Sequence, residues 1–199
     1  EELGRLDQPA ETHRHAAATA QTLAGVGLNL NLAPVVDLDA HPDNPIIKGK
    51  GRTFSADPGS VARHAAEFVR AHREHHVLAC AKHFPGHGSA TGDTHLGLVD
   101  VTATWREREL IPFQRLIAAG LGDVIMSAHV FNAKLDPEHP ATLSRSVITG
   151  LLREKLGFQG LIVSDDMEMK AISAHYGLEN SLPAAIAAGV DVLCLGNNL

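Results

Sequence analysis

A fourteen-residue stretch of the chain, residues 82–95, concentrates side chains that could move protons. It contains one ammonium group, three imidazoles and one carboxylate: Lys82, His83, His87, Asp93 and His95. Glycine and proline separate these groups, and the apolar run 77–81 comes directly before them. Polar groups at the carboxyl end of a buried strand are how a (β/α) barrel builds its active site. The stretch therefore predicts the proton-transfer part of an active site.

A second apolar run, residues 161–163, ends in the same way. Ser164, Asp165 and Asp166 follow it directly. A carboxylate at the end of a rigid strand is well placed to act as a nucleophile. Together, the two segments predict an enzyme with a His–Asp proton donor and a carboxylate nucleophile.

Several of these residues also have a plainer interpretation. His83, His87 and His95 could bind zinc, but they lack the helical spacing and the paired cysteines that favour a zinc site. We expect His87, which lies between two glycines, to hydrogen-bond to backbone. We expect Asp166 to cap a helix over 167–171. For Asp165 the position after the strand favours catalysis.

Further residues are assigned from their positions. Arg52, in a glycine-rich segment, and Lys82, at a buried strand end, are expected to contact substrate and not to form surface ion pairs. Asp37 and Asp39 are expected to shape the loop after the first strand. His129 follows another strand, and two roles stay open for it: the wall of the site, or a hydrogen bond within its loop. The histidines on predicted helices are expected on solvated faces: His13, His15, His72, His75 and His76.

Short apolar strands alternate with helices along the chain, which is typical of a parallel sheet. The expected helices cover 9–24, 60–75, 104–119, 145–155 and 183–188. The expected strands cover 28–36, 77–82, 124–128, 161–164 and 190–195. Polar residues mark the carboxyl end of every strand: Asp37, Lys82–His83, His129, Asp165–Asp166 and Asn197–Asn198.

The fold class indicated by this pattern is α/β. The expected architecture is a truncated (β/α)8 barrel of the TIM type, with about five of its eight β/α units present. An open doubly wound sheet is the alternative. Against that alternative, no glycine-rich turn of the dinucleotide-binding type follows the first strand.

The composition limits the partners of the chain. Its 17 basic and 23 acidic residues give a net charge of −6, which disfavours nucleic acid or an anionic membrane as a main partner. The sequence holds no run of 18 apolar residues that would predict a transmembrane helix. Cys80 and Cys194 lie in apolar runs, so both are expected to be buried free thiols. No oligomeric state follows from the sequence, and the cytoplasm is the working expectation for location.

The motifs resemble glycoside hydrolase family 3, in its β-N-acetylhexosaminidase branch. The resemblance rests on residues 82–88 with Asp93-Thr94-His95, and on residues 157–166. It extends from Asn29 to Asp191. The implied domain, residues 1–199, is part of a catalytic barrel whose first strands and last β/α unit are missing. The family needs neither a metal nor an organic cofactor, so none is expected.

The resemblance also implies a role for each motif residue. Asp165 would be the nucleophile, His95 the acid/base and Asp93 the residue that orients His95. The expected sugar-hydroxyl ligands are Arg52, Lys82 and His83. Because the β-glucosidase branch is not expected to carry the Asp-x-His tripeptide, that tripeptide also indicates the substrate class. The substrate would carry terminal nonreducing β-linked N-acetylglucosamine, as peptidoglycan fragments or chitin oligomers do.

The implied reaction is retaining hydrolysis through a covalent glycosyl-Asp intermediate. A histidine can replace the usual second carboxylic acid if its proton affinity suits neutral pH. Two alternatives stay open. One is a β-glucosidase or β-xylosidase of the same family, and the other is a non-catalytic sugar-binding remnant.

Overall fold

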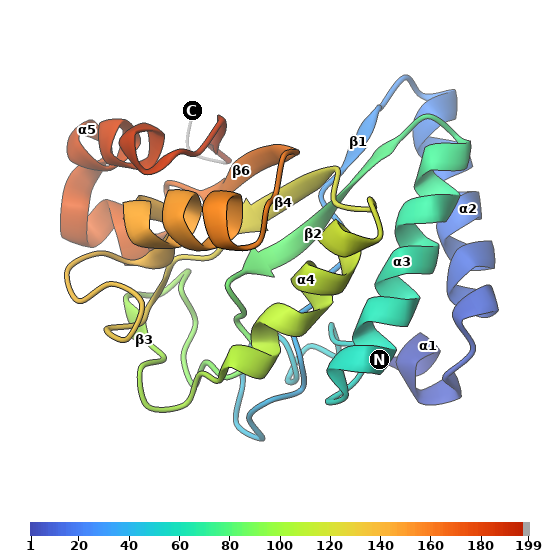
Figure 1. The fold of residues 1–199 in the computed structure, drawn as a ribbon, viewed down its shortest axis with the longest axis horizontal. Coiled ribbons are helices and arrows are strands. Elements are labelled where there is room, and N and C mark those ends of the chain that lie inside the picture. The colour runs from blue at the N-terminus through green and yellow to red at the C-terminus, as the bar shows by residue number, and fades with distance from the viewer. Residues whose placement is uncertain (197–199) are drawn as a thin grey trace.

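A computed structural model describes residues 1–196, so the polar strand end expected at Asn197–Asn198 lies outside the described residues (Figure 1). The helices are α1 Glu2–Leu6, α2 Pro9–Gly25, α3 Pro58–Glu74, η1 Glu107–Leu110, α4 Ile111–Ala118, η2 Ala141–Leu143, η3 Ser146–Lys155 and α5 Lys170–Ala188. The strands are β1 Leu30–Asn31, β2 Leu78–Phe84, β3 Val99–Asp100, β4 Val124–Ser127, β5 Val130–Phe131, β6 Leu161–Asp166 and β7 Val192–Cys194. Within residues 1–196, no helix is both long enough and apolar enough to cross a membrane.

Five strands form one parallel sheet in the order β1-β2-β4-β6-β7, and β3 pairs with β5 in a separate small sheet. The five strands thus follow one another across the sheet in chain order. Because crossovers between parallel strands are right-handed, the helices that join such strands lie on one face of the sheet. Accordingly, α3 packs against β2 and against α4 (Figure 1). A doubly wound sheet needs a reversal of strand order, and the five described strands contain none.

The two faces of the sheet carry different side chains, because successive residues of a strand point to opposite faces. The residues that belong to the large core with the helices include Ala79, Ala81, Ile125 and Ile162. The intervening residues form a smaller apolar cluster: Cys80, Val124, Met126 and Val163. Lys82 and Asp165 come two residues after Cys80 and Val163. The alternation therefore places both polar side chains at the end of this second face.

The first strand is much shorter than the predicted 28–36. Only Leu30–Asn31 forms a strand, and Val35 adds an isolated bridge to Lys82. Pro34 interrupts the ladder because proline has no N–H to donate. Its carbonyl still accepts a hydrogen bond from the backbone N–H of Lys82 at 3.1 Å. The segment thus stays attached to β2 and delivers Asp37 to the end of the sheet.

Two predicted helices have different bounds in the structure. The helix expected at 104–119 is divided into η1 and α4, and Pro112 lies in the first turn of α4. The helix expected at 183–188 begins much earlier, at Lys170, and bends at Gly177, where φ is 67°. Proline is common in the first turn of a helix, so the sequence favours a helix start at Pro183, and this prediction is wrong. Packing of α5 on η2 and η3 overrides that local preference.

Two predictions about exposure are wrong. His72 is fully buried on the inner side of α3, where its Nδ1 donates to the carbonyl of Phe68 at 3.0 Å and its Nε2 accepts from Asn31 Nδ2 at 2.9 Å. Burial lowers the pKa of His72, in agreement with the neutral ring that these partners require. Cys80 is buried as predicted, whereas Cys194 is only half-buried because β7 lies at the edge of the sheet.

Candidate active site

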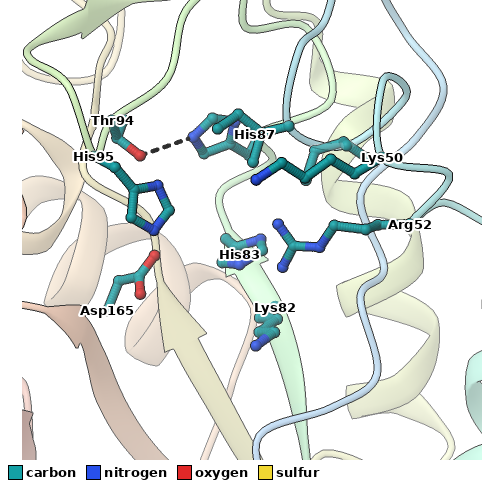
Figure 2. Close-up of a pocket in the computed structure, with 10 residues that line it drawn as sticks. Lys50, Arg52, Lys82, His83, His87, Thr94, His95 and Asp165 are labelled. Carbon is teal, nitrogen blue, oxygen red and sulfur yellow. Dashed lines mark hydrogen bonds between the residues drawn. The ribbon is translucent and has the colours of Figure 1, made fainter. Parts of the chain in front are cut away.

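The predicted site residues meet at one cavity at the carboxyl end of the parallel sheet. The cavity has a volume of about 350 Å³ and is lined by Ile46, Ile47, Lys50, Arg52, Lys82, His83, His87, Thr94, His95 and Asp165 (Figure 2). Five of the six predicted site residues belong to this lining, and the sixth, Asp93, contacts His95. Figure 2 shows His95 and Asp165 on one side of the cavity, with Lys50 and Arg52 opposite. Three segments that are distant in sequence thus form a single site.

Asp93 and His95 form a hydrogen-bonded pair at the mouth of the cavity. The ring Nδ1 of His95 donates to Asp93 Oδ1 at 2.7 Å, and the backbone N–H of His95 donates to the same oxygen at 2.8 Å. Burial tends to raise the pKa of Asp93, but the hydrogen bonds from His95 leave it below the ordinary value. The ionised carboxylate therefore fixes the proton on Nδ1. The other ring nitrogen, Nε2, is left for a proton transfer.

Asp165 is the last residue but one of β6 and is half-buried in the cavity wall. Its Oδ1 accepts the backbone N–H of Asp166 at 2.9 Å. Burial by itself raises the pKa of Asp165, but His83, His129 and the Asp166 N–H outweigh burial and leave the pKa below its ordinary value. The carboxylate is therefore ionised at neutral pH, as a nucleophile must be.

Asp37 has a larger role than the loop-shaping one predicted for it. Its Oδ2 accepts a hydrogen bond from His83 Nδ1 at 2.7 Å, and its Oδ1 accepts from the backbone N–H of His87 at 2.8 Å. The carboxylate is completely buried. It therefore sets the orientation and the tautomer of His83. A signal for this role was present in the sequence, since Asp37 directly follows the predicted strand 28–36 as Asp165 follows the predicted strand 161–164.

The loop before Arg52 is fastened by one buried amide to the loop that follows β2, residues 85–95, called the motif loop below. Asn44 donates from Nδ2 to the carbonyls of His87 and Gly88, at 2.8 and 3.0 Å, and its Oδ1 accepts from the backbone N–H of Ile47 at 2.6 Å. A Cβ on Gly88 would lie 2.0 Å from the carbonyl oxygen of Leu38, so only glycine allows the backbone at position 88 to pack this closely on Leu38. These contacts bring Ile46, Ile47 and Lys50 to the cavity. No motif in the sequence singled out these three residues.

Comparison with known proteins identifies the family of this chain. The model of the glycosyl hydrolase family 3 N-terminal domain matches residues 2–199. The chain belongs to glycosyl hydrolase family 3. The match confirms the resemblance found in the sequence.

Family 3 relatives are similar over most of this chain. A beta-hexosaminidase from Tolumonas auensis is 40% identical over 182 residues, which cover 90% of this chain and 53% of the relative. One from Stenotrophomonas maltophilia is 41% identical over 187 residues, with 92% and 54% covered. The chain spans about half the length of these curated relatives.

A solved family 3 structure has the same fold. The β-N-acetylglucosaminidase from Paenibacillus sp. is 39% identical, with a TM-score of 0.92 over 97% of this chain and 37% of that one. The similarity is consistent with a parallel α/β sheet that curls as half of a barrel. Closure into eight strands stays a prediction.

Two further motif residues of the family 3 chain differ from the sequence predictions. His87 was expected to bond to backbone, but its ring lines the cavity, with Nε2 3.3 Å from Thr94 Oγ1. Asp166 was expected to cap a helix at 167–171, but α5 begins at Lys170 and Met169 is its N-cap residue. A turn comes first, and Asp166 Oδ1 accepts the backbone N–H groups of Glu168 and Gly196, at 3.0 and 3.1 Å. Asp166 thus joins β6 to the segment after β7.

Lys82 also lines the cavity, on the same face of the sheet as Asp165. Burial lowers the pKa of Lys82, and Arg52 acts in the same direction, while the Asp165 carboxylate opposes both. Lys50, Arg52 and Lys82 face a single carboxylate, Asp165, in the lining. Such groups can donate hydrogen bonds to a polyhydroxylated ligand without accepting any.

Glu109 hydrogen-bonds to the motif loop from outside the cavity. Its buried carboxyl group is expected to make the free energy of unfolding depend on pH. Its carboxylate accepts the backbone N–H groups of Ser89 and Arg106, at 3.2 and 3.3 Å. Burial raises its pKa from 4.5 to about 7. Between these two values the folded chain binds this proton more tightly than the unfolded chain does. The free energy of unfolding therefore falls as pH rises through this range, by up to roughly 3 kcal/mol from this group.

We expect Glu109→Gln to flatten this part of the stability curve, because the amide has no proton to lose. The measurement is Tm against pH for the variant and the unmodified protein, and only the slopes are compared. Glu107→Gln, an exposed neighbour in η1, is the matched control and should leave the slope unchanged. An equal slope for Glu109→Gln and the unmodified protein would contradict the assignment.

Proposed function

We propose that this family 3 chain is the catalytic part of a retaining β-N-acetylhexosaminidase. Its substrate is a glycan with terminal nonreducing β-linked N-acetylglucosamine. The observation that carries the proposal is that the Asp93–His95 pair and the Asp165 carboxylate meet at one cavity. The names of the relatives from Tolumonas auensis and Stenotrophomonas maltophilia support it.

In the first step, an oxygen of Asp165 attacks the anomeric carbon of the sugar while the glycosidic C–O bond breaks. His95 enters the step as an imidazolium and transfers its Nε2 proton to the leaving oxygen. The Asp93 carboxylate, 2.7 Å from Nδ1, stabilises that imidazolium and holds the ring in position. The products of the step are the free aglycone, a neutral His95 and a sugar ester of Asp165.

In the second step, water replaces the aglycone. The neutral Nε2 of His95 takes a proton from the water as the water oxygen attacks the anomeric carbon. The bond between the sugar and Asp165 breaks, and the carboxylate is restored. Two displacements at one carbon return the sugar with its original β configuration. Proton transfer by a positioned group of this type contributes about 10²–10⁴-fold to the rate.

Arg52, Lys82 and His83 hold the sugar during both steps. Arg52 and Lys82 supply only hydrogen-bond donors, so they bind the oxygens of sugar hydroxyls. His83 is oriented by Asp37, with its Nε2 available for a ligand. These donors suit a carbohydrate, because they replace the hydrogen bonds that its hydroxyls lose with water on binding.

The test is turnover of matched nitrophenyl β-glycosides by the full natural chain, with and without the 2-acetamido group. The acetamido substrate is expected to be the better one by roughly 10²-fold or more in kcat/KM. Preference for the glucoside or xyloside would favour the other branch of the family. Glycan binding without any turnover would instead indicate a sugar-binding remnant.

Asp37→Asn tests how the site positions His83. If the amide oxygen keeps the backbone N–H groups of His83 and His87, which Oδ1 of Asp37 accepts at 3.3 and 2.8 Å, the amide NH2 faces His83 Nδ1 and favours the opposite tautomer. We expect about a tenfold rise in KM, with a smaller change in kcat, since His83 binds the sugar and transfers no proton. The matched control is Asp39→Asn, on the same loop outside the cavity lining. Unchanged KM in Asp37→Asn would contradict the role of this pair.

A further inference from the structure

His129 lies at the end of β4 and is completely buried, outside the cavity lining. Its ring bridges two segments. Nε2 is 2.9 Å from the backbone carbonyl oxygen of Asp166, and Nδ1 is 2.8 Å from the hydroxyl of Thr142. From the sequence, two roles are open for this residue: the wall of the site, or a hydrogen bond within its loop. The structure makes it a buried hydrogen-bonding group directly behind the end of β6.

The positions of the protons around His129 can be worked out from its partners. A carbonyl oxygen only accepts, so Nε2 carries a proton toward Asp166. The hydroxyl of Thr142 has one proton, and its oxygen lies 2.9 Å from the carbonyl oxygen of Ala128, which also only accepts. That proton therefore goes to Ala128. The two lone pairs of the Thr142 hydroxyl oxygen then accept hydrogen bonds from Ser127 Oγ, at 2.8 Å, and from His129 Nδ1.

This arrangement requires a proton on each ring nitrogen of His129. In a neutral ring with a proton on Nε2 alone, Nδ1 would accept a hydrogen bond from the Thr142 hydroxyl, and the Ala128 carbonyl would lose that donor. Leaving a buried polar group unpaired is costly. Ser127, Thr142 and His129 are all fully buried, so bulk water does not replace the lost partner.

The charged groups around His129 act in both directions. Burial is the largest influence and leaves the pKa of His129 below its ordinary value, and His83 on β2 acts in the same direction. Asp165, and the carbonyl and carboxylate of Asp166, all on β6, raise it. Hydrogen bonds that only a doubly protonated ring can donate add to the influence of β6. The hydrogen-bond geometry thus opposes the net lowering of the pKa, because a neutral ring would leave the buried Ala128 carbonyl without its donor.

We propose that His129 is a positioning residue, held as a buried imidazolium whose positive charge keeps Asp165 ionised and facing the sugar. The inference rests on the proposed role of Asp165. It also affects the second step. When the sugar is bonded to Asp165, one of the two carboxylate charges that act on the imidazolium is gone, and only that of Asp166 remains. Release of the sugar restores the carboxylate, so the charge on His129 favours that release.

Thr142→Val is the variant that isolates the charge, because it leaves His129 in place and removes the acceptor of the Nδ1 proton. We expect the acid limb of the kcat/KM profile of the full natural chain to move up by about one pH unit, the lower range for loss of one nearby opposite charge. Thr142→Ser keeps the hydroxyl and should leave the limb in place. His129→Gln should move it in the same direction. An unmoved limb in a folded Thr142→Val variant overturns the proposal.

Nitrogen-15 NMR of the histidine rings tests the charge without any turnover. The His129 signals, assigned by their loss in His129→Gln, should show a bonded proton on both ring nitrogens at pH 7. In Thr142→Val, one nitrogen should lose its proton. A single protonated nitrogen in the unmodified protein would overturn the inference even if Asp165 is the nucleophile. If Asp165 proves not to be the nucleophile, the NMR result still stands as a statement about His129.

Discussion

The Asp165→Asn variant is expected to lose roughly 10⁴-fold or more in kcat for every β-glycoside, because both displacements depend on the nucleophile that we propose Asp165 to be. The amide is a poor nucleophile, and no other carboxylate lines the cavity in residues 1–196. Activated leaving groups should not rescue the variant, since the bond to Asp165 must form whatever group departs. The measurement is the initial rate with nitrophenyl substrates of differing leaving-group acidity.

Asp166→Asn is the matched control for this experiment. It makes the same replacement of a carboxylate by an amide at the adjacent residue. The amide oxygen can still accept hydrogen bonds from the backbone N–H groups of Glu168 and Gly196. We expect a change of less than about tenfold. Equal losses in the two variants would show that both act through folding of the β6 end, and the assignment of Asp165 would then be wrong.

His95→Ala is expected to separate the two steps of the reaction. A poor leaving group needs the proton from His95, so kcat/KM for such substrates should fall by about 10²–10⁴-fold. A nitrophenolate departs without that proton, so kcat/KM for nitrophenyl substrates should fall far less. The second step still lacks its base, and the glycosyl ester on Asp165 should accumulate. A burst of nitrophenol followed by slow turnover, and the ester mass on the protein, are the measurements.

Asp93→Asn accompanies His95→Ala as the graded variant. The ring of His95 remains, but it loses the carboxylate 2.7 Å from Nδ1 that stabilises its charged form. We expect the same dependence on the leaving group with a smaller loss. His75→Ala, a histidine at the end of α3 and outside the cavity lining, is the control. If His95→Ala slows good and poor leaving groups equally, His95 is not the acid of the first step.

Much of the fold could be predicted because its determinants are local. Apolar runs such as 77–81 and 161–163 alternate with helical segments, and chain-order pairing of the strands agrees with the barrel-type winding predicted from them. The chemistry was local as well. Two-residue spacing was enough to predict the Asp93–His95 pair, because the carboxylate and the ring belong to one short loop.

Other features depended on contacts between distant segments. The pattern of α3 placed His72 on a solvated face, yet β1 supplies Asn31 and buries it. Asp37 and His83 are 46 positions apart, and only pairing of their two strand ends brings them to 2.7 Å. Lys50 reaches the cavity because Asn44 fastens its loop to the motif loop.

The sequence by itself therefore determined which residues are the candidate reactive groups and at which strand ends they lie. This follows from side-chain alternation and strand polarity, which are properties of short segments. The tertiary structure decided which of these groups share a cavity and which atoms each hydrogen-bonds. Those outcomes depend on strand register and on loop packing, which are settled by burial of the whole core and not by any one segment. The protonation state proposed for His129 depends on the tertiary structure in the same way, because its partners Thr142 and Asp166 lie on η2 and β6.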